Sequence, residues 1–346
     1  MDQAARTNAA MQMVLIHGMG DHCPGYGDIF ANNIAKQLKL TRQGQDAALI
    51  PLVSSIGATN WLREFSYSSP PRVLNVYELT WTPTTHSLKT NAFAKDRRLI
   101  PKRVKINKDL KNQVMEEGFG DAILYLNPSF RPKMQEPIRQ TIDRVEKHAG
   151  PNDKIVLVAS SLGSKMTFDT VEEWASEDRK VKHFAGRTSD ILMLANQLPL
   201  LHLAAGSNVF EHPHETSVKA FVRISRAQQQ KAPQPPDSED TNWFNINVVA
   251  ATDPNDLLSY PLRDEDVVPD DPEDEGQVKV VVSNIYSHNA WAIPFLFEHP
   301  GNAHTDYDQN QWLIKRLVRG FANKKDPLPK AVPDTFSCEL NPKKHL

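Results

Sequence analysis

The sequence of 346 residues predicts an α/β fold with a mostly parallel central sheet flanked by helices. Two observations support this prediction. Short runs rich in Val, Ile and Leu recur along the chain without strict polar alternation, which is typical of strands buried on both faces of a parallel sheet. Segments with apolar residues at helical spacing follow several of these runs, and strands that alternate with helices favour parallel pairing through right-handed crossovers.

Six apolar runs should form strands, and three segments should form helices. The expected strands cover 13–16, 73–81, 154–159, 190–196, 246–252 and 278–285. The expected helices cover 135–148, 164–177 and 312–321. In the first helix Ile138, Ile142 and Val145 form one apolar stripe, and Gly150 with Pro151 favours a helix end just before them.

We expect a single α/β domain over 1–346, with three long additions to a minimal sheet. The partly basic insert at 82–130 predicts either a cap over the site or a solvated helical excursion. The Pro- and Gln-rich stretch at 226–241 predicts a mobile loop. The acidic run at 263–275 lacks the ligand spacing and the glycine of an EF-hand, so we expect a solvated acidic loop instead of a calcium site. Nothing in the sequence indicates an oligomeric state.

Composition excludes several classes of function. Lys and Arg number 40 against 42 Asp and Glu, a formal net charge of -2, so neither nucleic acid nor an anionic membrane surface is expected as a partner. No apolar run reaches the length of a transmembrane helix, about 18 residues or more. The two cysteines, Cys23 and Cys338, form no CxxC pair, so neither a disulfide framework nor a zinc site is predicted. Residues 1–12 lack the apolar core of a signal peptide, which favours a cytoplasmic location.

The strongest chemical signal is the segment VLVASSLGS at 156–164, where a buried strand runs into a helix through a serine. A nucleophile elbow needs small residues two positions before and after its serine, because the sharp turn brings neighbouring backbones close together. Ala159 and Gly163 meet this need around Ser161. A register centred on Ser160 would place a valine and a leucine there. Ser161 is therefore the predicted nucleophile, with a helix N-cap as its alternative role.

A second signal is the sequence HGMG, directly after the first predicted strand. His17, Gly18 and Gly20 match the HGxG pattern of oxyanion loops, in which glycines let backbone N–H groups turn toward a developing negative charge. The expected donors are the N–H groups of Met19 and of Leu162, the residue after the predicted nucleophile. A phosphate-binding loop is disfavoured, because the segment is neither a GxGxxG nor a Walker A sequence.

Candidate acids and bases follow the last two predicted strands. Asp253 and Asp256 come after the strand at 246–252, and either could orient a base. Three histidines after the last strand could take a proton: His288, His299 and His304. The order serine, aspartate, histidine along the chain is one of the orders in which a hydrolytic triad occurs.

Together these motifs resemble the α/β-hydrolase superfamily, on the esterase and lipase side, over 13–321. The resemblance implies that Asp256 is the acid, because NDLLSYPL is similar to a segment that carries the acid in many lipases and esterases; Asp253 stays open as the alternative. It implies that His304 is the base, because this fold presents its base in a loop just before the C-terminal helix.

The resemblance also implies a reaction. Ser161 would attack an ester carbonyl while His304 takes its proton, and water would then release the acyl group from the enzyme. The expected substrate is a small-molecule or lipid ester. No cofactor and no metal are expected, since the sequence has no HExxH pattern, and Asp121 in GDAILYL is interpreted as structural. The alternatives are an acyltransferase with the same triad and a non-catalytic binding protein on the same fold.

Overall fold

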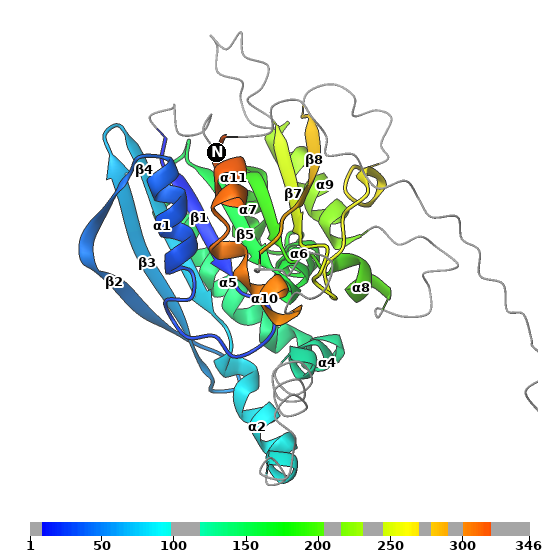
Figure 1. Cartoon of the computed structure of the whole chain (residues 1–346). Helices are drawn as coiled ribbons and strands as arrows, with labels where there is room; N and C mark the ends of the chain where they lie inside the picture. Colours follow the sequence, from blue (N-terminus) through cyan, green and yellow to red (C-terminus); the bar gives the residue numbers. More distant parts are fainter. Residues whose placement is uncertain are drawn as a thin grey trace, which may run out of the picture.

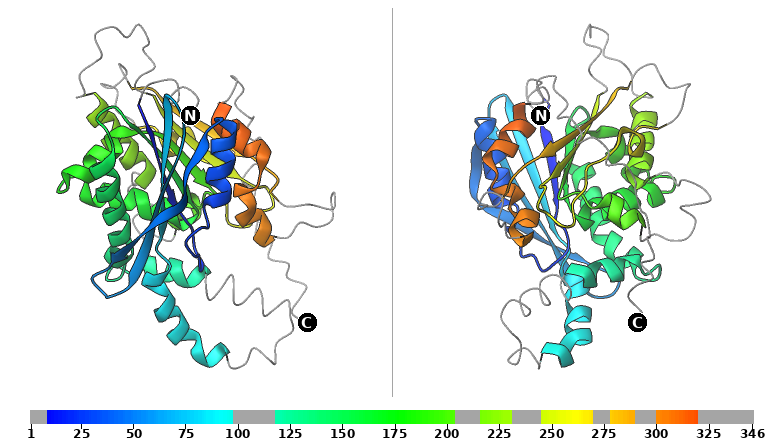
Figure 2. Two further views of the ribbon diagram at one scale, coloured as in Figure 1. Left: turned by 90° about the vertical axis from the view of Figure 1, so that its left-hand side faces the viewer. Right: turned by 45° about the vertical axis from the view of Figure 1, so that its right-hand side comes forward.

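The computed structural model describes residues 9–97, 118–203, 216–230, 245–269, 278–289 and 300–319. These residues form a mixed α/β structure around a sheet of eight strands in the order β2-β3-β4-β1-β5-β6-β7-β8. Helices cover both faces of this sheet, as Figures 1 and 2 show. The predicted class, α/β with a mostly parallel central sheet, is therefore confirmed.

The described elements follow the chain in this order. The strands are β1 (Met11–Ile16), β2 (Thr41–Val53), β3 (Thr59–Ser69), β4 (Arg72–Thr80), β5 (Lys154–Ser160), β6 (Thr188–Leu194), β7 (Ile246–Thr252) and β8 (Val280–Tyr286). The helices are α1 (Asp28–Gln37), α2 (Pro83–Arg97), α4 (Gly120–Leu126), α5 (Arg131–His148), α6 (Leu162–Trp174), α7 (Arg179–Arg187), α8 (Leu198–Leu203), α9 (Ser217–Gln229), α10 (Pro300–Thr305) and α11 (Gln311–Arg319), with the short turns η5 (Asp264–Asp266) and η7 (Asp306–Asp308). Each predicted strand and helix coincides with one of these elements, apart from shifts at the ends.

The sequence does not predict β2 and β3, which form an antiparallel pair beside β4. The buried residues of β3 change face midway, from Leu62 on one face to Phe65 on the other, so the strand shows neither a continuous apolar run nor a regular alternation. β2 lies at the sheet edge, contains Gly44 with a φ of 71°, and shifts its register between Gln43 and Ala48. An edge strand tolerates such a glycine and Pro51, but they interrupt the apolar pattern on which the prediction depends.

β1 lies near the centre of the sheet and is buried on both faces. Its side chains Met13 and Leu15 join the core with α1 and α11, whereas Val14 and Ile16 join the core with α5 and α6. The left view of Figure 2 shows these two helix layers on opposite sides of the sheet. This two-sided burial is the physical reason that β1 is an apolar run without alternation.

The connections after β1 and β5 leave the sheet toward opposite faces. β1 leads into α1 on one face, and β5 leads into α6 on the other. The two strands are parallel neighbours, with Ile16 beside Ala159 at their carboxyl ends. In open α/β sheets a crevice forms where neighbouring connections diverge in this way, and ligands bind there. The fold therefore points to the carboxyl ends of β1 and β5 as the place for a site.

The insert at 82–130 supplies α2 and α4, which extend from one end of the sheet in Figure 1. Residues 98–117 within it lie outside the described residues. The contacts of α2 and α4 with the loop after β1 are given below. None of the described helices is both long and apolar enough to cross a membrane.

The two other predicted additions are described in part. α9 continues to Gln229, so the loop predicted from Arg226 begins later than expected. The side chain of Gln229 is buried and donates to Ser225 Oγ at 3.1 Å, which favours continuation of the helix. In the acidic segment, η5 is a single turn in which Arg263 pairs with Asp266. The remaining parts of these additions, 231–241 and 270–275, lie outside the described residues.

Candidate active site

Ser161 lies at the turn between β5 and α6, where the elbow motif predicts it. Its backbone has a φ of 52° and a ψ of -126°, a conformation that non-glycine residues rarely adopt and that is often found at functional sites. The N–H of Ser161 donates to Leu194 O at 2.8 Å, which ties the turn to the end of β6. Its Oγ is buried and has no hydrogen-bond partner among the described residues. An unpaired buried hydroxyl is costly, so this one calls for a functional explanation.

The elbow is crowded, and two glycines make it possible. A Cβ on Gly163 would lie 2.3 Å from His17 O and 3.0 Å from Ile16 O, which are backbone atoms with little room to move. A Cβ on Gly18 would lie 2.6 Å from Ser161 Cβ. The first turn of α6 therefore rests on the end of β1, which explains the need for small residues on both segments.

His17 anchors the loop after β1. Its ring stacks on Trp81 with the centroids 4.6 Å apart, and its Nε2 accepts the Trp81 N–H at 3.1 Å. The hydrogen is then on Nδ1, which donates to Gly18 O at 2.8 Å. Burial, followed by the neighbouring His22, holds the pKa of His17 well below its ordinary value, so the ring is neutral. Because the C=O and N–H of a trans peptide point in opposite directions, the N–H of Met19 faces away from His17.

Both expected oxyanion donors are close to Ser161. Leu162 is the first residue of α6, so its N–H is among the groups that a helix leaves without an internal partner, at the positive end of the helix dipole. Met19 follows Gly18, which packs directly against Ser161, and both loop residues line the same cavity as the serine.

Asp256 and His304 come together from the turn after β7 and from α10. His304 Nδ1 lies 2.9 Å from each carboxylate oxygen of Asp256. The carboxylate also accepts the Leu258 N–H at 2.9 Å and the Tyr307 hydroxyl at 3.4 Å. Burial alone raises the pKa of Asp256, but the hydrogen bond and charge of His304 outweigh it, and the pKa lies below its ordinary value. His304 is in the last turn of a short helix and not in a loop as expected.

Asp253, the other candidate acid, has backbone partners. Its Oδ1 accepts the Asn255 N–H at 2.9 Å, and its Oδ2 accepts the Asn289 N–H at 2.6 Å. The side chain is fully buried, and it ties the turn after β7 to the end of β8. Of the two candidate acids, the structure thus brings Asp256 to the favoured histidine.

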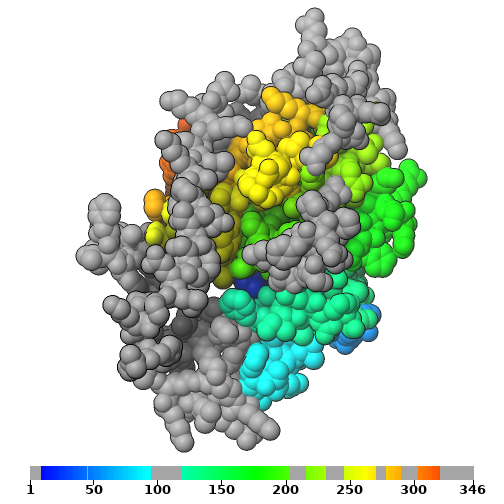
Figure 3. Space-filling view, turned by 90° about the vertical axis from the view of Figure 1, so that its right-hand side faces the viewer, coloured from blue at the N-terminus to red at the C-terminus, as the bar shows by residue number. Residues whose placement is uncertain are grey.

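Ser161 and His304 line one cavity of about 290 Å³ at the carboxyl ends of β1 and β5. Ser161 Oγ does not hydrogen-bond to His304, as its lack of a partner among the described residues shows. Of the other candidate bases, His288 is exposed, and His299 lies outside the described residues. In Figure 3 part of the N-terminal segment (dark blue) is visible in a hollow beside α4 (teal).

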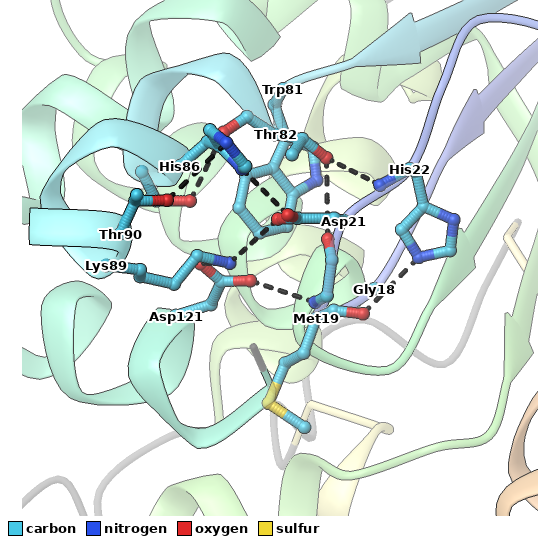
Figure 4. Close-up of polar contacts among 12 residues, drawn as sticks. Gly18, Met19, Asp21, His22, Trp81, Thr82, His86, Lys89, Thr90 and Asp121 are labelled. Carbon is cyan, nitrogen blue, oxygen red and sulfur yellow. Dashed lines mark hydrogen bonds and ion pairs between the residues drawn. The ribbon is translucent and has the colours of Figure 1, made fainter. Parts of the chain in front are cut away.

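The loop after β1 is also held by polar groups from the insert, as Figure 4 shows. Asp121 on α4 accepts the Gly20 N–H at 2.9 Å through Oδ2. Lys89 Nζ on α2 lies 2.8 Å from Asp121 Oδ1 and 3.2 Å from Asp21 Oδ1. His86 Nδ1 lies 2.7 Å from Asp21 Oδ2. Sequence reasoning singled out Asp121 but missed Lys89, because no motif connects an isolated lysine on a polar helix to this loop.

No family model matches the chain, and no curated protein matches it. Among solved structures, the chain is similar to "Structure of YahD with Malic acid", with a probability of 0.99. The two chains are 10% identical, the TM-score is 0.31, and the match covers 91% of this chain and 95% of the other. Among the described residues, no group of three or more His, Cys, Asp or Glu side chains could hold a metal ion.

Proposed function

We propose that the protein is a serine hydrolase with an α/β-hydrolase fold, which cleaves small-molecule or lipid esters with Ser161 as nucleophile, His304 as base and Asp256 as acid. One observation carries this proposal. A serine at a strained strand-to-helix turn shares a cavity with a histidine whose Nδ1 is held by a buried carboxylate. Nucleophile, base and orienting acid are recognised by these roles on unrelated folds.

The carboxylate of Asp256 determines the tautomer of the base. Because Nδ1 of His304 donates to Asp256, its Nε2 carries a lone pair and accepts the proton of Ser161 Oγ. The serine then attacks the ester carbonyl, and the N–H groups of Met19 and Leu162 stabilise the negative charge on the carbonyl oxygen. His304 passes its proton to the leaving alcohol. It then takes a proton from a water molecule whose oxygen attacks the acyl carbon, and it returns this proton to Ser161 Oγ as the acid is released.

In this proposal the hydrogen bond between Ser161 and His304 forms when the substrate is in place. The two side chains line one cavity without bonding to each other. Hydrogen bonds between catalytic groups often tighten only in the complex with substrate, so the separation is compatible with the mechanism.

A fluorophosphonate probe tests the proposal, because it reacts with serines that a base activates. We expect one adduct, located on Ser161 by mass spectrometry of the digested protein, and none on Ser161→Ala. His304→Ala should label at least about 10²-fold more slowly, whereas His288→Ala should label like the wild type. Labelling at an unchanged rate in Ser161→Ala, or no labelling of the wild type, would contradict the proposal. Product analysis with and without an added alcohol then separates a hydrolase from an acyltransferase.

A further inference from the structure

A buried ion pair in the insert holds the loop after β1, and the proposed reaction does not use it. We infer that Asp121, together with Lys89, is a positioning residue that directs the N–H of Met19 at the oxyanion. This inference rests on the proposed function and deepens it, because it gives α2 and α4 a task in the reaction.

Side chains hold both peptide groups that flank Met19. On one side, the carbonyl before Met19 accepts from His17 Nδ1 at 2.8 Å. On the other side, the Gly20 N–H donates to Asp121 at 2.9 Å, and the Met19 carbonyl lies 3.3 Å from His22 Nε2. Each peptide group is a rigid plane, so two fixed planes determine the backbone angles of the residue between them. The Met19 N–H lies in the first plane, which His17 holds directly. Asp121 acts on this N–H through the second plane, because holding that plane restricts rotation about the backbone bonds of Met19.

The carboxylate that fixes the second plane is costly to bury. Asp121 is 0% exposed, and the side chain of Lys89 is 4% exposed. A buried ion pair generally adds little stability compared with apolar side chains of similar volume, whereas a charge-assisted bond to a backbone N–H is strong and directional. The presence of this buried pair is therefore explained better by the position that it imposes on the loop than by a gain in stability.

A second buried carboxylate provides a matched control within the same loop. Glu78 on β4 is 0% exposed, accepts the N–H groups of Gly25 at 2.6 Å and Gly27 at 3.0 Å, and pairs with Arg63 at 3.0 Å. It makes the same kinds of contact as Asp121, but farther along the loop, where the chain enters α1. Removal of either carboxylate should lower stability, but only removal of Asp121 should weaken binding of the transition state.

The test measures hydrolysis of a p-nitrophenyl ester and inhibition by a trifluoromethyl ketone, which forms a tetrahedral oxyanion adduct with an activated serine. We expect Asp121→Leu to lower kcat by about 10- to 10²-fold, less than the loss of a whole oxyanion donor, with little change in KM. The affinity for the ketone should fall by the same factor as kcat/KM. Asp121→Asn keeps an acceptor oxygen for the Gly20 N–H, so we expect a loss of only about threefold in both measurements.

The control variants are Glu78→Leu and Glu78→Gln, which should melt at a lower temperature than the wild type but keep kcat and ketone affinity within about twofold. If a folded Asp121→Leu keeps both values, or if Glu78→Leu loses as much, the inference is wrong. If Asp121→Leu and Glu78→Leu do not fold, the test uses Asp121→Asn and Glu78→Gln. Equal kcat and equal ketone affinity in these two variants would overturn the inference. A wild type that neither cleaves the ester nor binds the ketone would overturn the proposed function itself.

Discussion

The ends of β5 and β7 each lead into a turn through two residues of the same type, and the structure distinguishes the two residues in different ways. Ser160 ends β5 and Ser161 follows it, and only Ser161 takes the positive φ of 52°. After β7, Asp253 and Asp256 are both buried carboxylates in one loop, 0% and 6% exposed. Both accept backbone N–H groups, and they differ in that Asp256 also pairs with His304.

The difference shows which choices are local and which are long-range. In the first turn the backbone decides, because only Ser161 has small residues two positions before and two positions after it, Ala159 and Gly163. In the second turn a partner decides, and it lies 48 residues away along the chain. The comparison predicts that substitutions in the turn after β5 act by changing the backbone angles or by removing the nucleophile. Substitutions in the turn after β7 should act according to which partner the substituted carboxylate loses, a backbone N–H group or His304.

Substitution of the two serines should give the largest contrast. Ser161→Ala should lower kcat/KM for short p-nitrophenyl esters by about 10⁴-fold or more, because loss of the nucleophile removes nearly all that a triad contributes. Ser160→Ala should keep most of the activity. Steady-state kinetics on both variants measures this contrast, and equal losses of activity would contradict the assignment of Ser161 as the nucleophile of an elbow.

Substitution of the two aspartates should separate activity from stability. Asp256→Asn should lower kcat by about 10³- to 10⁴-fold, because an amide holds the imidazole in the wrong tautomer. Asp253→Asn offers one acceptor oxygen for two backbone N–H groups, so it should lower the free energy of unfolding by about 1–3 kcal/mol and keep most of the activity. Kinetics and urea unfolding of each variant test this pair, and the reverse pattern would make Asp253 the acid.

A methyl group added at the turn after β5 should lower the free energy of unfolding more than truncation of an exposed side chain in the turn after β7. Gly163→Ala would place a Cβ 2.3 Å from His17 O, so we expect a loss of about 1–3 kcal/mol or more in the free energy of unfolding. Leu257→Ala changes a side chain that is 72% exposed in the turn after β7 and should stay within about 0.5 kcal/mol. Similar losses in urea unfolding would mean that the two turns are equally constrained.

The smallest expected effect is the pH dependence that Asp256 gives to stability. Its pKa in the fold lies below the ordinary value, chiefly because His304 outweighs the effect of burial. A lowered pKa stabilises the fold above the unfolded pKa of about 3.9, and this contribution is lost as the pH falls through the folded pKa. The difference in unfolding free energy between wild type and Asp256→Asn should therefore shrink below about pH 4. A difference that grows on acidification would contradict the ion pair.

Much of the fold could be predicted because it follows from burial on two faces. β1, β5 and β7 read as apolar runs since helices cover both sides of them. β2 and β3 could not be predicted in this way, because β2 is an irregular edge strand and the buried residues of β3 change face midway along the strand. The sequence of α10 predicts a loop, because Gly301 and Asn302, which have low helix propensity, lie within its six residues. In the structure, tertiary contacts outweigh this low propensity.

The sequence by itself determined the strand-to-helix elbow at Ser161 and the glycine loop after β1, because both depend on residue size at fixed spacing and on backbone angles. The resemblance of the segment after β7 favoured Asp256 and left Asp253 open, and the tertiary structure decided between them, since only one of the two carboxylates contacts the distant segment that carries His304. The tertiary structure also decided that Lys89 on α2 pairs with Asp121 on α4, which accepts the Gly20 N–H. Such a contact has no sequence period or spacing, because it is made by the packing of separate elements and not by any one of them.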